Sequence, residues 1–436
     1  MIERLIPSLN METESEIIII GAGAAGLMAG VMLSKSFRVI ILEGRDRCGG
    51  RINTHYDVFP DAIEAGAEFI HGEQKLTHEL ASRYGLSCQA VEGRFYEFRS
   101  GRVSEDDQSD PQWSKLFRVL DTLDEDIDMQ HFLDKHFSGG EFSGLRQRVK
   151  AFAEGYDAAD LTRVSAFALR NEWQNQDDEN QSRLHSGYGE LIRRMEAEFR
   201  DNGGTVFFES VVHKAGWKPN HVIIETATGN TFISKILITT VPLGVLQREH
   251  ITFDPELSEH KAGFKKLGFG GVIKFFYRFT PVLQERLMKR FPKFSFIFSD
   301  ARVPTWWSQN PSEIPVITGW LAGPSACEVA GNVSVLQQMA LDSLAYLLDC
   351  SVDEVSQNIT ANHIADWISD PFTCGAYAYA TVGSADTIQF LSRPLSDTLY
   401  FAGEALYHGP AMGTVEAALQ SGSQVAQRIL SAAGIS

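Results

Sequence analysis

The sequence has little that would tie the chain to a membrane or to an oxidising compartment. Its five cysteines include no Cys-x-x-Cys pair, and their odd number leaves one unpaired under any full pairing, which favours a reducing compartment. No stretch offers about 18 uninterrupted apolar residues, and the start of the chain contains acids and no apolar signal-peptide core. We therefore expect a cytoplasmic protein with no membrane anchor.

Positive charge is also scarce. The 436 residues include 39 Lys and Arg against 56 Asp and Glu, which gives a net charge of −17. Nucleic-acid binding depends on clustered basic residues, so this balance argues against nucleic acid as a partner. An acidic chain suits a cationic substrate, although the same charge can serve solubility alone. With 44% hydrophobic and 22% charged residues, the composition predicts a globular protein of two or three domains.

What the sequence does contain is a dinucleotide-binding fingerprint between residues 17 and 43. An apolar strand is followed by a glycine-rich turn, an apolar helix, a second strand and an acid. Gly21 permits the tight turn, Gly23 lets the backbone approach a pyrophosphate, and Gly26 lets helix and strand pack closely. The helix N-terminus offers N–H groups to phosphates, and Glu43 is expected to bind the ribose hydroxyls. The predicted contacts are Gly21, Gly23, Ala24, Ala25, Gly26 and Glu43.

Strands that fit one nucleotide-binding sheet occur at the start, the middle and the end of the chain. This order predicts an α/β and α+β fold with a discontinuous Rossmann-like cofactor domain over residues 15–82, 203–262 and 392–436. The remainder, residues 83–202 and 263–391, is expected to form a substrate domain with a mixed sheet and a helical insertion over residues 111–200. In that sheet Phe294, Phe296 and Phe298 alternate, which predicts one face and a core role, and the adjacent Trp306 and Trp307 are expected in a core or an interface.

Seven sequence blocks, in order along nearly the whole chain, resemble the flavin-dependent amine oxidases. That family includes monoamine oxidases, polyamine and spermine oxidases and lysine-specific histone demethylases. The blocks are GAGAAG with Glu43, RCGGRINT, EAGAEFIHG, TTVPLGVL, LGFGGVIKFFYRF, DPFTCGAYAY and FAGEALYHGPAMGTVEAALQSG. The resemblance implies FAD rather than NAD, and we expect no metal site. Where monoamine oxidases carry a cysteine linked to the flavin this chain has Ala376, so FAD is expected to bind non-covalently.

The resemblance also implies the other contacts to FAD. Arg51 would face the pyrophosphate, which suits its planar donors, and the main chain of Val212 would meet the adenine. Glu404 would lie near the ribityl and pyrophosphate groups, and residues 66–69 would pass beside the flavin. The implied contacts are Arg45, Gly50, Arg51, Gly66, Ala67, Glu68, Phe69, Val212, Gly403, Glu404, Thr414 and Val415.

Lys274 is the residue we most expect to serve the chemistry. It lies in the apolar strand VIKFFYRF, where an unpaired ammonium is costly to bury, so it needs a partner or a lowered pKa unless its side chain reaches solvent. The resemblance implies that Lys274 holds a water against flavin N5. It also implies that Tyr377 flanks the substrate amine, although alternating aromatics can be plain core, and that His71 meets the amine or takes a proton.

These expectations combine into an FAD-dependent oxidation of a mono- or polyamine. Hydride would pass from the carbon next to nitrogen to flavin N5, the imine would hydrolyse, and O2 would be reduced to H2O2. An L-amino acid oxidase or another flavin oxidoreductase of the same fold is the alternative enzyme. A histone demethylase is disfavoured because nothing resembles its N-terminal module or tower insertion. A non-catalytic GDI-like escort protein is disfavoured by the presence of Arg51, Glu404 and Lys274, and the places of Tyr407 and His408 and the oligomeric state stay open.

Overall fold

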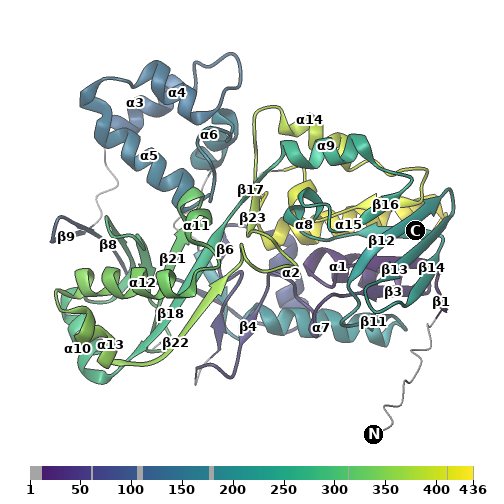
Figure 1. The fold of residues 1–436 in the computed structure, drawn as a ribbon, viewed down its shortest axis with the longest axis horizontal. Helices are drawn as coiled ribbons and strands as arrows, with labels where there is room; N and C mark the ends of the chain where they lie inside the picture. Colours follow the sequence, from purple (N-terminus) through teal and green to yellow (C-terminus); the bar gives the residue numbers. More distant parts are fainter. Residues whose placement is uncertain are drawn as a thin grey trace, which may run out of the picture.

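A five-stranded parallel sheet forms the centre of one half of the molecule (Figure 1). The structure, a computed structural model, describes residues 12–59, 62–105, 111–175, 181–312, 314–409 and 411–435. The sheet has the order β11-β3-β2-β15-β24, and each neighbouring pair is parallel. Its strands are β2 (Ile17–Ile20), β3 (Val39–Leu42), β11 (Thr205–Phe207), β15 (Ile236–Thr239) and β24 (Leu399–Phe401).

Each central strand of this sheet serves two cores because successive side chains point to opposite faces. Ile17 and Ile19 of β2 pack against helices on one face, whereas Ile18 and Ile20 pack against a second sheet on the other. The helices are α1 (Ala24–Leu33), α7 (Tyr188–Asp201) and α15 (Val415–Ala432). The second sheet has the order β1-β14-β13-β12-β16, with β1 (Glu12–Glu14), β12 (Val212–Lys218), β13 (His221–Thr226), β14 (Thr231–Ser234) and β16 (Thr252–Asp254). Covered on both faces, β2 and β3 are continuous apolar runs.

Helix α7 lies with this first half, although the predicted insertion over residues 111–200 counted most of it with the substrate domain. One face of α7 carries Leu191, Met195 and Phe199, all buried in the same core as Ile17 and Ile19. The apolar spacing of the helix is therefore satisfied by α1 and not by the other helices of the insertion. The remaining domain limits stay a prediction.

The other half is built on a mixed seven-stranded sheet with the order β22-β18-β21-β20-β19-β8-β9. Only the β19–β8 pair is parallel, and the other neighbours are antiparallel. The strands are β8 (Arg94–Arg99), β9 (Arg102–Glu105), β18 (Val272–Phe279), β19 (Phe294–Ser299), β20 (Thr305–Trp307), β21 (Val316–Ala322) and β22 (Ile359–Asp366). Helices α10 (Pro281–Arg290), α11 (Pro324–Val329), α12 (Val333–Leu348) and α13 (Val352–Gln357) accompany it, and residues of all four pack into one core with the sheet.

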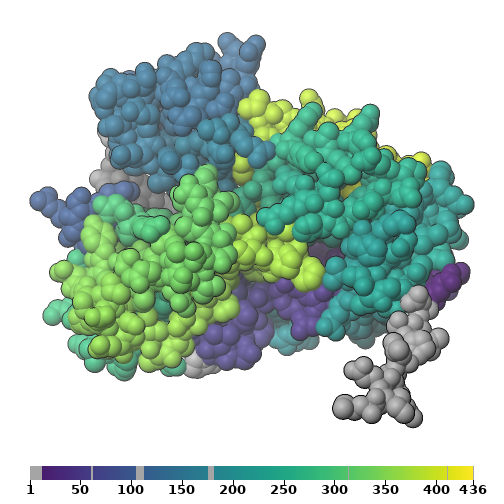
Figure 2. Space-filling model, in the orientation of Figure 1, coloured from purple at the N-terminus to yellow at the C-terminus, as the bar shows by residue number. Residues whose placement is uncertain are grey.

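A helical unit stands beside this sheet as a lobe of its own (Figure 2). It consists of α3 (Pro111–Leu120), α4 (Met129–His136), η1 (Gly140–Phe142), α5 (Ser143–Gly155) and α6 (Ala166–Asn175), and it has a separate core that includes Leu116, Phe132 and Val149. Short elements join the parts: β4 (Thr54–His55), β5 (Ile63–Glu64), β6 (Ile70–His71), α2 (Lys75–Arg83), β7 (Cys88–Ala90), β10 (Gln181–Leu184), α8 (Leu243–Gln247), α9 (Ser258–Lys266), β17 (Gly268–Gly270), β23 (Tyr377–Tyr379), α14 (Ser384–Leu391) and η2 (Glu404–Leu406).

The predicted fold class is confirmed. A Rossmann-like sheet is assembled from three distant parts of the chain and is joined to a mixed sheet and a helical insertion. Among the described residues, no helix has both the length and the hydropathy that a membrane crossing requires.

Candidate active site

A cavity of about 2500 Å³ runs from the carboxyl edge of the parallel sheet to the seven-stranded sheet. Of the catalytic and cofactor-binding residues that the sequence predicts, all but Gly26 line it, from Gly21 at one end to Lys274, Tyr377 and His71 at the other. Tyr407 and His408, for which the sequence predicts no position in the site, also line the cavity. The volume exceeds the upper range of about 1,000 Å³ for ordinary ligand sites, as a dinucleotide plus a substrate would require.

The glycine-rich turn shapes the first end of the cavity through its backbone. Gly21 has φ +103, in the left-handed region that favours glycine. A Cβ on Gly26 would lie 2.0 Å from the carbonyl oxygen of Gly21, so only glycine fits there, at the close-packed position that the fingerprint assigns to it. Helix α1 begins at Ala24, and its first N–H groups have no partner within the helix and face the cavity with Ala24 and Ala25.

Glu43 closes this end with a carboxylate that is only 6% exposed. Its Oε2 accepts a hydrogen bond from the N–H of Ala22 at 2.7 Å, and its Oε1 accepts one from the N–H of Arg45 at 2.9 Å. Each carboxylate oxygen can accept a further bond. The acid is thus held in place by the backbone and still offers acceptors to ribose hydroxyls.

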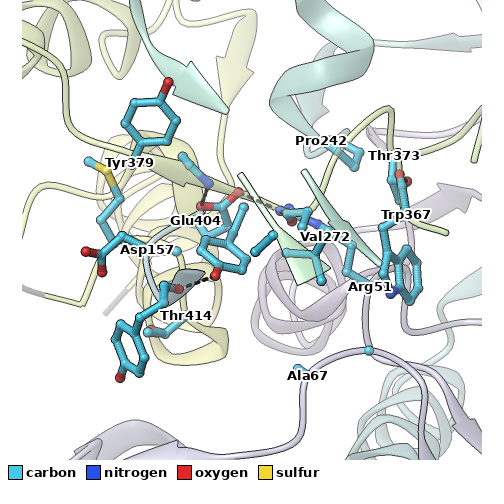
Figure 3. A pocket seen from close by; sticks show the side chains of 18 of the residues that line it. Arg51, Ala67, Asp157, Pro242, Val272, Trp367, Thr373, Tyr379, Glu404 and Thr414 are labelled. Carbon is cyan, nitrogen blue, oxygen red and sulfur yellow. Dashed lines mark hydrogen bonds and ion pairs between the residues drawn. The ribbon is translucent and has the colours of Figure 1, made fainter. Parts of the chain in front are cut away.

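Two arginines and an acid line the middle of the cavity. Nη1 of Arg51 donates to Oε1 of Glu404 and to the carbonyl of Ala376, both at 2.6 Å (Figure 3). Oε2 of Glu404 accepts from the N–H of Ala378 at 3.3 Å, so both oxygens of this acid are held by protein donors. Arg45 pairs with Asp370 at 2.7 Å. The Arg51 guanidinium is therefore held by Glu404 at the cavity wall, and its planar donors would suit a phosphate there.

Two further observations show that the residues fit a bound dinucleotide. The side chain of Gln74 is 7% exposed and lines the cavity, yet its Oε1 has no hydrogen-bond partner among the described residues. Buried polar atoms are nearly always paired, so this oxygen calls for a donor from a ligand. Gly403 lies in the same wall with φ +140, and no described heavy atom lies within 4 Å of the place of a Cβ there, which leaves its backbone open to the cavity.

Comparison with known proteins agrees with this geometry. The profile of the flavin-containing amine oxidoreductases matches residues 24–430. The chain belongs to this family. Probable polyamine oxidase 5 of Arabidopsis thaliana is 25% identical, over 96% of this chain and 99% of that protein. Lysine-specific histone demethylase 2 of Homo sapiens is 26% identical, over 95% of this chain and 53% of that protein.

Solved structures share the fold. A putrescine oxidase bound to putrescine has a TM-score of 0.78 at 18% identity, covering 97% of this chain and all of that one. Cyclohexylamine oxidase from Brevibacterium oxydans IH-35A has a TM-score of 0.79 at 18% identity, covering 96% and 99%. The family makes the chain an FAD-dependent oxidoreductase, so the interpretation as a non-catalytic escort protein is set aside.

In this flavin amine oxidoreductase, Lys274 lies inside the protein at 1% exposure and does not reach solvent. Its Nζ donates to the carbonyl of Glu64 at 2.7 Å, to the carbonyl of Gly66 at 3.2 Å and to Oε2 of Glu68 at 2.8 Å. The partner that the sequence required for a buried ammonium is thus Glu68. The resemblance placed Glu68 beside FAD, and the structure shows that its side chain turns to Lys274 while the residue lines the cavity.

Tyr377 and His71 face the cavity near Tyr156. The hydroxyl of Tyr377 donates to the carbonyl of Tyr156, and burial raises the pKa of Tyr377 well above its ordinary value, so the phenol stays neutral. Nδ1 of His71 lies 3.3 Å from the Tyr156 hydroxyl. Burial lowers the pKa of His71 to about 4, so its imidazole is neutral at physiological pH. Tyr379, two residues on, packs into the core of the helical unit and also lines the cavity.

Sequence reasoning missed two parts of this wall. Asp157 is 6% exposed and lines the cavity (Figure 3). It accepts a hydrogen bond from Nε1 of Trp173 at 3.4 Å. Burial, and then the neighbouring Glu172, raise its pKa well above the ordinary value for an aspartate. Nothing in the sequence around Asp157 marks it, because its burial depends on tertiary packing, in which Trp173 of α6 is brought against it.

The second missed part is aromatic. Phe294 is core, as expected, but Phe296 and Phe298 line the cavity and stack on Phe95, with ring planes within 5° of one another. The expectation of one core face for these residues is wrong because the strand register shifts between Phe294 and Phe296, which changes the face. Trp306 and Trp307 are both buried, as expected, and Trp307 in addition lines the cavity.

Proposed function

We propose that the protein oxidises primary or secondary amines with FAD, and that a substrate with a second amino group is preferred. When bound, FAD accepts hydride from the carbon next to nitrogen and passes two electrons to O2 to give H2O2, while the imine hydrolyses to a carbonyl compound and an amine or ammonia. The observation that carries this proposal is the meeting of Lys274, Tyr377, His71 and Asp157 in one cavity with the dinucleotide-binding turn.

The cavity wall suits an amine that must lose its charge before it is oxidised. Tyr377 and His71 are neutral, so neither repels a cation, and the aromatic face of Tyr377 can orient it. With Nδ1 of His71 protonated and donating to Tyr156, Nε2 can accept a hydrogen bond from the amine. Because apolar walls disfavour an ammonium, activity should rise with pH as more substrate enters as the free amine.

Asp157 and Glu172 suit a second cation. Burial and mutual repulsion favour one proton on this pair of acids, and a cationic amino group could replace that proton. Relatives named as polyamine oxidases and a solved putrescine oxidase support the same substrate class. An L-amino acid oxidase would need a cation for the carboxylate. Arg183, which shares Glu68 with Lys274, is committed to Glu68 and to the carbonyls of Ser308 and Asn310.

The test is anaerobic bleaching of the bound flavin by a panel of amines, followed by a peroxide assay in air. The panel should include putrescine, spermidine, cyclohexylamine, benzylamine, an L-amino acid and a methylated lysine peptide. We expect diamines and polyamines to bleach the flavin fastest, with one peroxide formed for each amine oxidised. A colourless protein, or a flavin that only the amino acid or the peptide reduces, would contradict the proposal.

A further inference from the structure

The first turn of helix α2 is capped by a distant acid instead of by its own N-cap residue, Gln74. A side chain at the N-cap position commonly accepts hydrogen bonds from N–H groups of the first turn. Here Glu416 of α15 accepts from the N–H of Leu76 at 3.1 Å and from the N–H of Thr77 at 2.8 Å. It also accepts from the Thr77 hydroxyl at 2.7 Å. The amide of Gln74 is therefore not needed to cap its helix.

The backbone of Gln74 is fixed while its side chain faces the cavity. Its N–H donates to the carbonyl of Gly72 at 3.0 Å, and its carbonyl accepts from the N–H of His78 at 3.0 Å. The side chain is 7% exposed, and Oε1 meets no donor in the part of the chain that the structure describes. Leaving a buried amide oxygen unpaired is costly, and a ligand with a donor at this place would offset the cost.

Neighbouring contacts place Gln74 at the end of the cavity that holds His71 and Tyr377. Gln74 follows His71 by three residues, and both line the cavity. The segment that leads into α15 reaches the same end, since a Cβ on Gly413 would lie 3.3 Å from Cδ2 of Tyr377. Three residues after Gly413, Glu416 holds the first turn of α2. The Gln74 amide therefore lies where an amine would be oxidised, away from the glycine-rich turn.

FAD carries N–H donors in two places. One is the adenine amino group, which belongs with Glu43 and Val212 at the other end of the cavity. The other is N3–H of the flavin ring, which lies between two ring carbonyls. A carboxamide has one acceptor oxygen and two N–H donors, so it can serve the N–H and a carbonyl of that edge together. An ammonium would use the acceptor alone and would leave Nε2 of Gln74 facing a cation.

We propose that Gln74 binds the pyrimidine edge of the flavin ring: Oε1 accepts from N3–H, and Nε2 donates to a carbonyl beside it. The inference takes FAD from the family assignment. It rests on the proposed function only in placing the flavin ring near His71 and Tyr377. Glu416 contributes indirectly, because its capping of α2 leaves the amide to the ligand.

The experiment compares FAD with 3-methyl-FAD, an analogue in which a methyl group replaces the hydrogen on N3. The holoenzyme is dialysed to equilibrium against an equimolar mixture of the two flavins, and the bound ratio is measured by chromatography. We expect the wild type to prefer FAD by about tenfold or more, because the analogue leaves a buried acceptor without its donor. Gln74→Met removes the amide and keeps a long, flexible side chain, so its preference should fall to within about threefold.

The matched control is Gln420→Met. Nε2 of Gln420 donates to Oε1 of Glu416 at 3.0 Å, so this amide belongs to the same network but does not line the cavity. Q420M should keep the wild-type preference for FAD. A Q74M enzyme that prefers FAD as strongly as the wild type would overturn the inference, whether its melting temperature falls, as for a merely structural residue, or its KM for amines rises, as for a substrate contact.

A second variant covers the case in which methionine does not pack at this position. Gln74→Ala removes the amide and leaves space, so it should lose the preference as Q74M does, and a full preference would count against the inference. The readout uses no amine. An amine panel that fails would therefore contradict the proposed function and leave the flavin preference unchanged, whereas a wild type that binds both flavins equally would contradict only the role of Gln74.

Discussion

The cofactor end of the cavity, which we define as residues 21–51, is built around a glycine-rich turn and the N-terminus of α1. The reaction end, defined by Glu68, His71, Asp157, Lys274 and Tyr377, is built from side chains. The cofactor end is formed within one short stretch of the chain, whose turn can close only because Gly26 has no Cβ. The reaction end draws on four distant segments. Substitutions at the first end should therefore act on folding and FAD retention, and those at the second on substrate choice and rate.

Gly26→Ala is the strongest test of this division. Its Cβ would lie 2.0 Å from the Gly21 carbonyl oxygen and 2.9 Å from Oγ1 of Thr240, so the backbone must move. Overpacking of this kind costs about 1–3 kcal/mol and at times more. We expect a protein with little or no bound FAD and a melting temperature lowered by several degrees, as measured by the flavin-to-protein absorbance ratio and a thermal melt.

Gly23→Ala is the control within the same fingerprint. A Cβ there would meet only the carbonyl oxygen of Gly49, at 3.9 Å, so the fold has room for it. The cofactor-free variant should melt like the wild type and bind FAD more weakly, by about tenfold, because the backbone can no longer approach the pyrophosphate as closely. If G26A retained full FAD, or if G23A melted as early as G26A, the division between fold and ligand contact would fail.

The two ends also differ in what could be predicted from the sequence. The glycine turn and Glu43 are readable because their geometry is set within 27 consecutive residues. The need of Lys274 for a partner was predictable from the cost of a buried ammonium, but the partner lies 206 residues away and was assigned another role. The face of Phe296 depends on a register shift, and the burial of Asp157 on packing with the helical unit. Long-range packing of this kind leaves no local pattern.

Asp157→Asn tests whether a side chain of the reaction end determines the choice of substrate. The substitution keeps the shape of the side chain and removes the charge that the second ammonium of a diamine would meet. We expect the KM for a diamine to rise by about tenfold with kcat little changed, and the KM for a monoamine of similar length to stay the same. Steady-state peroxide assays with both substrates measure the difference.

Asp160→Asn is the matched control for this effect. Asp160 lies three residues further along the same loop, but its Oδ1 accepts hydrogen bonds from the N–H and the hydroxyl of Thr162. It should leave both KM values unchanged. A D157N enzyme that lost affinity for monoamines and diamines alike would show that Asp157 shapes the cavity in general and does not recognise a second cation.

The smallest expected effect is on the pH dependence of stability, and it comes from two titratable side chains, those of Glu64 and His71. Burial raises the pKa of Glu64 from 4.5 to about 7, so between these values the folded protein keeps a proton that the unfolded chain has lost. Stability contributed by this group therefore falls as pH rises through that window. Burial lowers the pKa of His71 from 6.5 to about 4, so the unfolded chain binds the extra proton and stability falls as pH drops.

Glu64 and His71 change the stability of the protein with pH in opposite directions. Removing one of these groups should therefore reveal the pH dependence that the other contributes. Glu64→Gln cannot titrate, so relative to the wild type its stability should rise between pH 4.5 and pH 7. Because the Glu64 side chain is only half-buried and solvent screens its charge, we expect a change of about 1 kcal/mol, or about 2 °C in melting temperature. His71→Asn should no longer lose stability as the pH drops, but it should still lose stability as the pH rises, because Glu64 is unchanged. Thermal melts of the FAD-loaded proteins across this range measure both, and parallel curves for wild type and E64Q would mean that Glu64 is already ionised in the folded protein.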